Sequence, residues 1–306
     1  MKKRLLITGY GGFVAGSVAW QADSSWEVHA LSHTRASEQR DDFRYWQGDL
    51  CNTALLHKTF WEIRPSAVIH AAARADIDYC QSHQEEAARI NTGVTQELAQ
   101  LCNDSGAKLI FCSTDSLFDG QAGRYRENTE PSPINFYAET KVHAEQAVQQ
   151  YAANAVTARL SLVLGLPVLG TGNSFLAKMS TALKSGKNVC FPENEIRTPI
   201  DVITLGQALL ELAANDFTGI IHLAGSTRLN RYDMGCRIAE RLGYSTDLIT
   251  GTNSNVMQGR APRPNDVSLN NEKAGAILDT PMKTLREGLD QVLKAKEKQD
   301  NEQPRN

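Results

Sequence analysis

The chain has 306 residues, of which 41% are hydrophobic, so it can bury a large core as one domain or two. Its formal net charge is −3 at pH 7, which argues against a nucleic-acid or anionic-membrane partner. No apolar run approaches the ~20 residues that a membrane-spanning helix needs.

The cysteines are scattered along the chain and form no Cys-x-x-Cys pair. This usage is typical of reduced thiols in the cytoplasm rather than of a disulfide framework or a zinc site. The six positions are Cys51, Cys80, Cys102, Cys112, Cys190 and Cys236. We therefore expect a cytoplasmic protein, and we interpret Cys112, which falls in a predicted buried strand, as a core residue.

A glycine-rich turn joins the first predicted strand to the first predicted helix. Lys3–Thr8 is expected to form the strand, and the helix follows the turn. Glycines let the backbone turn tightly and approach a pyrophosphate, which binds the free N–H groups at the start of the helix. The best register is Gly9-x-x-Gly12-x-x-Ala15, because Val14 breaks the Gly-x-Gly-x-x-Gly spacing. An ordinary tight turn is the alternative, but this position favours nucleotide binding.

The end of the second predicted strand, Trp26–Leu31, indicates the cofactor. It is followed by Ser32-His33-Thr34-Arg35, with no carboxylate before Glu38. A dehydrogenase that prefers NAD usually has Asp or Glu here to bind the ribose 2′-hydroxyl. Arg35 and the neighbouring hydroxyls could instead bind a 2′-phosphate, so NADP is favoured and NAD is possible. A solvated loop is the alternative.

Further along, predicted strands alternate with predicted helices, which is typical of a parallel sheet covered on both faces. The remaining strands are expected at 44–46, 66–72, 108–112, 156–164 and 219–223, and helices include 85–101 and 135–151. The predicted fold class is α/β, a Rossmann-type doubly wound parallel sheet with a smaller C-terminal substrate-binding domain.

The domain boundary is expected to be interleaved, because the strand at 219–223 returns to the first sheet. The dinucleotide-binding domain is expected over residues 1–166, with a returning segment at about 198–228. Residues 167–197 and 229–296 are expected to bind substrate. The polar residues 297–306 are expected to be a disordered tail.

The most informative stretch lies in the helix at 135–151, where Tyr137 and Lys141 are four residues apart. Side chains at this spacing project from the same helix face. An unperturbed phenol has a pKa near ~10, and a nearby ammonium favours the phenolate. The pair therefore predicts a tyrosine that exchanges protons, although a surface helix can carry this spacing by chance.

Several segments occur in an order and spacing that point to one family. They are Thr8-Gly9-x-x-Gly12, Gly48-Asp49-Leu50, Arg64-Pro65-x-x-Val68-Ile69-His70-Ala71-Ala72-Ala73, Ser113-Thr114-Asp115-Ser116-Leu117-Phe118-Asp119-Gly120, Pro133-x-Asn135-x-Tyr137-x-x-Thr140-Lys141, Arg197-Thr198-Pro199-Ile200-Asp201-Val202, His222-Leu223-Ala224-Gly225 and Arg263-Pro264-x-Asp266-Val267-Ser268-Leu269. With these segments the chain resembles the extended short-chain dehydrogenase/reductases, most closely the dTDP-4-dehydrorhamnose reductase branch. The resemblance extends to about Leu293.

The resemblance implies a role for each matching residue. Tyr137 would protonate the carbonyl oxygen, Lys141 would lower the pKa of that phenol and hold the nicotinamide ribose, and Thr114 would hydrogen-bond the substrate oxygen. Cofactor contacts are implied for Gly9, Tyr10, Gly11, Gly12, Phe13 and Val14 at the pyrophosphate, Asp49 and Leu50 at the adenine, Ala71, Ala72 and Ala73 along the backbone side, and Leu160 and Ser161 at the nicotinamide. A strand-end cap is the alternative role for Thr114, and a turn residue for Asp49.

Two departures from the family pattern fall where the sugar would bind. Ser116 replaces a tyrosine of the family, which exchanges an aromatic wall for a small hydroxyl. The segment 76–80 also lacks the usual acidic pattern of rhamnose reductases. The identity of the sugar is therefore open, and no carboxylate cluster predicts a metal.

Three functions are consistent with this sequence. The leading one is reduction of a 4-keto nucleotide-linked deoxysugar by NADPH. A nucleotide-sugar epimerase or dehydratase with bound NAD is the second, although elimination commonly uses Asp-Glu after the threonine and the chain has Asp115-Ser116. The third is a non-catalytic NADP-binding regulatory subunit, like the methionine adenosyltransferase β subunit.

The C-terminal region is expected to close over the substrate. Asn173, Arg197 and Arg263 are candidates for binding the nucleotide, since guanidinium groups match diphosphate oxygens. Structural salt bridges are the alternative role for the two arginines. By analogy with the superfamily, the helices at 85–101 and 135–151 could form a homodimer face.

Overall fold

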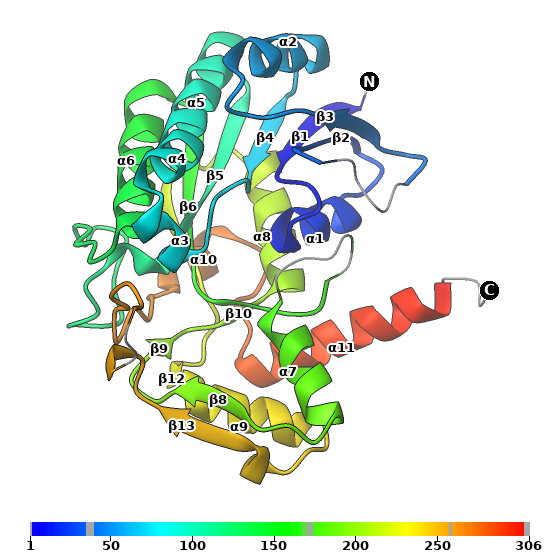
Figure 1. The fold of residues 1–306 in the computed structure, drawn as a ribbon. Coiled ribbons are helices and arrows are strands. Elements are labelled where there is room, and N and C mark those ends of the chain that lie inside the picture. The colour runs from blue at the N-terminus through cyan, green and yellow to red at the C-terminus, as the bar shows by residue number, and fades with distance from the viewer. Residues whose placement is uncertain (1, 35–39, 168, 170–173, 257–258, 303–306) are drawn as a thin grey trace.

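The computed structural model describes residues 2–34, 40–167, 169, 174–256 and 259–302. Its centre is a seven-stranded parallel sheet with the strand order β11-β6-β5-β4-β1-β2-β3 (Figure 1). The strands are β1 Lys3–Thr8, β2 Trp26–Ser32, β3 Arg44–Gln47, β4 Ala67–His70, β5 Lys108–Thr114, β6 Ala155–Leu160 and β11 Gly219–Leu223. The order reverses between β1 and β4, which is where doubly wound sheets bind ligands. The predicted fold class is confirmed.

Helices cover both faces of this sheet (Figure 1). Leu5 and Ile7 of β1 point to the face covered by α1, α8 and α10, while Leu6 points to the face covered by α2, α5 and α6. Such alternation follows from the two-residue period of a strand. The first set is α1 Phe13–Gln21, α8 Val202–Ala214 and α10 Glu272–Ile277; the second is α2 Thr53–Ile63, α5 Val94–Ser105 and α6 Phe136–Tyr151.

Two predicted elements are interrupted in the structure. The expected helix at 85–101 consists of α4 Gln84–Ala88, a π-helical turn at Arg89–Gly93 and the start of α5, and it follows the short helix α3 Ile77–Ser82. The expected strand at 156–164 ends at Leu160, because the chain leaves the sheet there. Its last part, β7 Val163–Leu164, pairs instead with β10 Ile200–Asp201.

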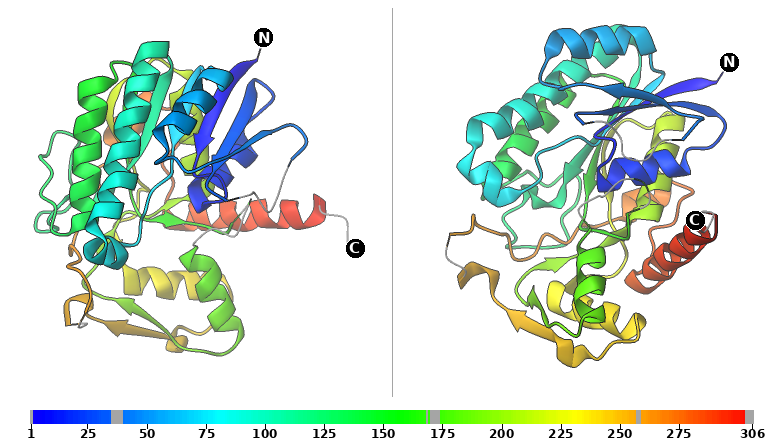
Figure 2. Two further views of the ribbon diagram at one scale, coloured as in Figure 1. Left: turned by 45° about the horizontal axis from the view of Figure 1, so that its top comes forward. Right: turned by 45° about the vertical axis from the view of Figure 1, so that its right-hand side comes forward.

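A smaller unit lies beyond the carboxyl ends of the sheet strands and has its own apolar core (Figure 2). It contains α7 Phe175–Lys184, β8 Val189–Pro192, β9 Ile196–Arg197, β12 Leu229–Asn230, α9 Arg231–Arg241 and β13 Ile249–Thr252. The last helix is α11 Leu285–Glu302, which extends into the segment expected to be a disordered tail. Within the described ranges, no helix is both long and apolar enough to span a bilayer.

Candidate active site

Two pockets meet at the carboxyl ends of β1, β4 and β5 and share Ala71 and Ala73. The first has a volume of about 570 Å³ and contains most of the residues expected to bind the cofactor. These are Gly9, Tyr10, Gly11, Gly12, Ser32, His33, Thr34, Asp49, Leu50, Ala71, Ala72 and Ala73. Arg35 lies outside the described residues.

Gly9 brings the turn after β1 close to the end of β4. Its φ is +79°, and a Cβ there would lie 2.8 Å from the backbone of Ala72. Gly12 precedes α1 and supplies no side-chain cap, so the first N–H groups of that helix are available to an anion. Ala15 is buried, as its predicted packing role requires.

The last two residues of the predicted pyrophosphate loop point elsewhere. The Phe13 ring packs against the apolar core of the smaller unit, and Val14 lines the second pocket. Neither Phe13 nor Val14 is among the residues that line the first pocket.

The second pocket, of about 360 Å³, holds the residues expected to do chemistry. Asn135 caps α6, because its Oδ1 accepts a hydrogen bond of 3.0 Å from the amide of Ala138, and this fixes the start of the helix that carries Tyr137 and Lys141. Thr114 ends β5, and Tyr137 makes a hydrogen bond with it. The structure therefore brings Thr114, Tyr137 and Lys141 together.

Burial dominates the protonation of this pair. It raises the pKa of Tyr137, and the Thr114 hydrogen bond offsets only part of the rise. Burial also lowers the pKa of Lys141 to about 8, against the opposing influence of Cys112 and Glu145. Lys141 Nζ donates to the Cys112 carbonyl at 2.8 Å. The ammonium is directed toward β5, and the expected lowering of the Tyr137 pKa by Lys141 stays a prediction.

Ser116 and Asp115 continue the floor of the second pocket after Thr114. The Ser116 hydroxyl donates to Asp115 Oδ1 at 3.2 Å, and Ser161 donates to Asp115 Oδ2 at 3.2 Å. Burial raises the pKa of Asp115, while Arg197, 3.9 Å away, opposes the rise. Leu160 and Ser161 line the same pocket, beside Lys141.

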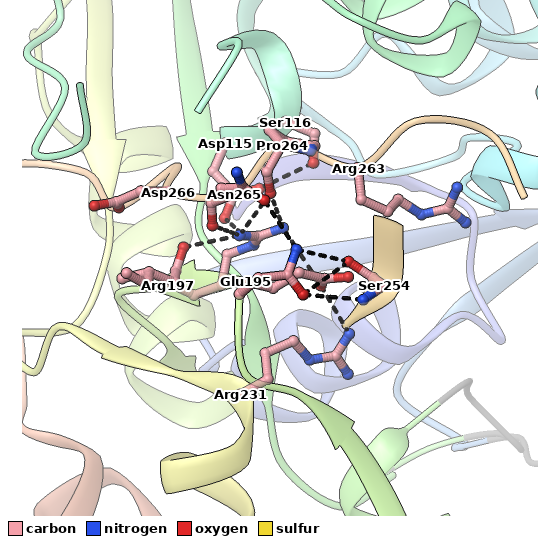
Figure 3. A network of polar contacts seen from close by, with 12 residues as sticks. Asp115, Ser116, Glu195, Arg197, Arg231, Ser254, Arg263, Pro264, Asn265 and Asp266 are labelled. Carbon is pink, nitrogen blue, oxygen red and sulfur yellow. Dashed lines mark hydrogen bonds and ion pairs between the residues drawn. The ribbon is translucent and has the colours of Figure 1, made fainter. Parts of the chain in front are cut away.

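Arg197 and Arg263 line this pocket but already have partners, and Figure 3 shows the contacts of Arg197. Arg197 Nη1 donates to the Ile196 carbonyl at 2.8 Å, and the guanidinium lies between Asp115 and Glu195, at 3.9 and 3.6 Å. Arg263 makes a two-point contact with Asp78, at 2.9 and 2.8 Å. The structural salt bridges considered as their alternative role are present. Asn173 lies outside the described residues.

The geometry agrees with comparisons to known proteins. Residues 2–298 match the family described as the RmlD substrate binding domain. The chain belongs to this family. It is 28% identical over 298 residues to "Methionine adenosyltransferase 2 subunit beta" of Xenopus tropicalis, covering 94% of this chain and 87% of that protein. It is also 28% identical over 301 residues to "dTDP-4-dehydrorhamnose reductase" of Mycobacterium tuberculosis, covering 96% and 93%.

A solved structure shows the same fold for an RmlD-family protein. The dTDP-4-dehydrorhamnose reductase of Bacillus anthracis, in complex with NADP, superposes with a TM-score of 0.86 at 22% identity and covers 96% of this chain and 99% of that one. The predicted resemblance to the dTDP-4-dehydrorhamnose reductase branch is confirmed.

Several charged residues of this RmlD-family site were not predicted. Arg74, Glu86 and Arg89 line the first pocket, and Glu195, Arg231 and Arg260 line the second. They come from segments without a recognisable motif, so only the folded chain brings them to the site. Across the described residues, no group of three His, Cys, Asp or Glu side chains could hold a metal ion.

Proposed function

We propose that this protein is an NADPH-dependent reductase that acts on the 4-keto group of a nucleotide-linked deoxysugar. The observation that carries the proposal is the meeting of Thr114, Tyr137 and Lys141 in the second pocket, which adjoins the first. A carbonyl placed there would be within reach of both a hydroxyl donor and a buried cation. The reductases among its relatives support the same chemistry.

The first pocket fits a dinucleotide. A pyrophosphate would bind the uncapped N–H groups of α1, over the close turn that Gly9 permits. The adenine would lie near Asp49 and Leu50, and His33 and Thr34 would face a 2′-phosphate. When bound, the nicotinamide supplies the hydride. NADP is the proposed cofactor and NAD is the alternative.

The side chains of the second pocket would place the carbonyl and supply its proton. Thr114 and Tyr137 would donate hydrogen bonds to the carbonyl oxygen, which gains negative charge during reduction. Burial raises the pKa of Tyr137, so the phenol stays protonated at neutral pH and is ready to act as a general acid. Lys141 would hold the ribose hydroxyls of the cofactor beside them.

The rim of the second pocket supports an anionic substrate. Arg231, Arg260 and Arg263 line it, and guanidinium groups suit a diphosphate. Glu195 Oε1 and Arg231 Nε are buried and have no hydrogen-bond partner among the described residues, so a polar substrate group would satisfy both. We propose these residues for the nucleotide sugar; Ser116 would leave room beside the sugar.

A regulatory subunit is the second candidate, because curated relatives at 26–29% identity are named methionine adenosyltransferase 2 subunit beta. In that case the cofactor pocket would serve binding alone. A dehydratase has less support, since Ser116 stands where elimination commonly uses a carboxylate and its hydroxyl bonds Asp115.

One experiment separates the two candidates. A set of 4-keto nucleotide sugars is incubated with NADPH, and its oxidation is followed by absorbance for the wild type and for Tyr137→Phe. Turnover that depends on Tyr137 supports the reductase. Tight NADPH binding without turnover on any keto sugar, together with capture of a methionine adenosyltransferase catalytic subunit, supports the regulatory role.

We also propose, by analogy alone, that two copies associate through α5 and α6. Sedimentation velocity tests this. A single species at the mass of one chain over the accessible concentration range would contradict it.

A further inference from the structure

A third residue continues the helix face that carries Tyr137 and Lys141. Glu145 lies four residues after Lys141 on α6, a spacing that places the two side chains next to each other. Glu145 is buried, and the guanidinium of Arg159 on β6 donates hydrogen bonds to both oxygens of its carboxylate. Arg159 Nε lies 3.1 and 3.2 Å from the two oxygens, and Nη2 lies 2.8 Å from Oε2.

Arg159 is itself fixed by its surroundings. Its side chain is 2% exposed, Nη1 donates to the Glu127 carbonyl at 3.3 Å, and the guanidinium lies 5.4 Å from the centre of the Phe118 ring. Desolvating two charges is costly, and apolar replacements for buried ion pairs are often neutral or stabilising. Stability alone therefore does not explain why this pair is buried one helical turn from the catalytic lysine.

The groups that face Lys141 come from several elements. From β5 there are the Cys112 carbonyl and thiol and the Phe111 ring, whose centre is 4.0 Å from Nζ. Burial raises the pKa of the Cys112 thiol to about 12, so it is neutral at pH 7. From β4, His70 is kept neutral by a pKa that burial lowers to about 3.

On α6 itself, Lys141 is flanked by a neutral Tyr137 and by Glu145. Glu145 is the carboxylate in this set, and it opposes the effect of burial on the ammonium. Arg159 donates to both oxygens of that carboxylate, which fixes its orientation. Lys141 Nζ donates to the Cys112 carbonyl, so the carboxylate one helical turn away acts on the ammonium through space rather than by direct contact.

We propose that Glu145, held in place by Arg159, is a positioning residue that keeps Lys141 charged for its role in the active site. The catalytic use of this charge rests on the proposed function. The effect of Glu145 on the pKa of Lys141 does not depend on whether the protein turns over a sugar. Without Glu145, Lys141 would be a buried ammonium surrounded by neutral groups, and it would release its proton at a lower pH.

The test is a titration of Lys141 by NMR on protein with ¹³C-labelled lysine, the signal being assigned by its loss in Lys141→Met. Three proteins are compared: wild type, Glu145→Gln, and the double variant Glu145→Gln/Arg159→Met. The single variant leaves the buried charge of Arg159 unpaired and could fold poorly for that reason. The double variant removes both charges, so the Lys141 pKa can still be measured in the absence of Glu145.

The pKa of Lys141 should be highest in the wild type, lower in the double variant and lowest in Glu145→Gln. In Glu145→Gln it should be about one pH unit below that of the wild type. Asp290→Asn is the matched control, because it removes a carboxylate from a different ion pair, with Arg241, 2.5 Å away between α9 and α11. It should leave the Lys141 titration unchanged. Equal pKa values in wild type and both Glu145 variants would overturn the proposal.

A second readout is the pH dependence of NADPH affinity, measured by fluorescence in the absence of any sugar. In Glu145→Gln the affinity should begin to fall about one pH unit lower than in the wild type. A shifted lysine titration in a protein that binds no NADPH would sink the proposed function while leaving this inference standing, so the two failures are distinguishable.

Discussion

At the scale of single residues, the protonation of Tyr137 and Lys141 is set by burial. The phenol has a raised pKa and the ammonium a lowered one, because each is removed from water. The sequence spacing correctly brings Tyr137 and Lys141 to one helix face, but spacing alone cannot show that Lys141 Nζ is directed to the Cys112 carbonyl. That detail depends on how β5 packs under α6.

Tyr137→Phe should lower kcat by about 10²–10⁴-fold, the usual contribution of general acid catalysis. The ring and its packing are retained, so NADPH affinity should change little. Steady-state kinetics on an identified keto sugar, with fluorescence titration of NADPH, measures both quantities. Reduction at the wild-type rate would show that the proton comes from another group.

Lys141→Met should stabilise the cofactor-free protein while weakening NADPH binding. The pKa of Lys141 is about 8 in the folded chain and near 10.5 when unfolded, so between these values the unfolded state binds more protons. Stability of the wild type therefore rises with pH over that window, and below pH 8 the buried charge costs on the order of 2–4 kcal/mol. The variant should lack this rise.

Denaturant unfolding of wild type and Lys141→Met at pH 7 and pH 10 checks the prediction. The lost hydrogen bond to the Cys112 carbonyl offsets part of the gain, by about 1 kcal/mol. If the free energy of unfolding changes equally between pH 7 and pH 10 in the wild type and the variant, the buried ammonium does not carry the cost assigned to it.

At the scale of elements, the sequence predicts the strands and helices that have a regular apolar pattern, but not the points where a helix or strand is interrupted. The buried strands 3–8 and 108–112 and the helix at 135–151 follow from apolar runs and flanking signals, and the structure contains all three. The π-helical turn at Arg89–Gly93 has no such signal. It contains Asn91, whose side chain accepts a hydrogen bond from the Arg74 amide and donates one to Thr140 across the fold. Tertiary contacts of this kind override local propensity.

The turn before α1 provides a matched pair of glycines. Gly9→Ala should cost more stability than Gly11→Ala, although both residues have positive φ, at +79° and +93°. A Cβ at Gly9 would meet the backbone of Ala72 at 2.8 Å, whereas one at Gly11 has nothing within 4 Å. Strained φ costs about 1–3 kcal/mol in each variant, and forced packing adds about 1–3 kcal/mol for Gly9.

Thermal unfolding and NADPH titration of the two glycine variants compare these costs. Gly9→Ala should also lose cofactor affinity, because the turn would have to move away from β4. Equal losses in the two variants would mean that the close approach of Gly9 to Ala72 contributes nothing.

At the scale of the whole molecule, the second pocket is assembled from distant segments. Glu195, Arg231 and Arg263 come from separate segments (Figure 3), and they line the pocket that also contains Thr114 and Tyr137. The motifs at 113–120 and 133–141 predicted one side of this pocket. The other side depends on the packing of the smaller unit against the sheet, and no local pattern encodes that geometry.

Asp78 links these two parts of the chain directly. From α3 it contacts Arg263 at 2.9 and 2.8 Å, Arg260 at 3.8 Å and the amide of Ala261 at 2.9 Å. These contacts hold the segment that carries Arg260 and Arg263, which line the second pocket. The guanidinium of Arg263 also lowers the pKa of Asp78, so the linkage is complete above the ordinary carboxyl pKa and is lost as the pH falls through the depressed value.

Asp78→Asn should therefore loosen the pocket rim without unfolding either part. The amide of Ala261 should exchange its hydrogen faster, by about fivefold or more for a loss of ~1 kcal/mol. Hydrogen-exchange mass spectrometry of the peptide that contains Ala261 measures this at neutral pH, with Asp290→Asn as the control for loss of a distant carboxylate. Because Arg263 would gain freedom in the variant, the affinity for a nucleoside diphosphate should change together with the exchange rate. Unchanged exchange at Ala261 would mean that the contacts from Asn135 to the Pro262 carbonyl, at 3.1 Å, and elsewhere in the segment hold the rim without Asp78.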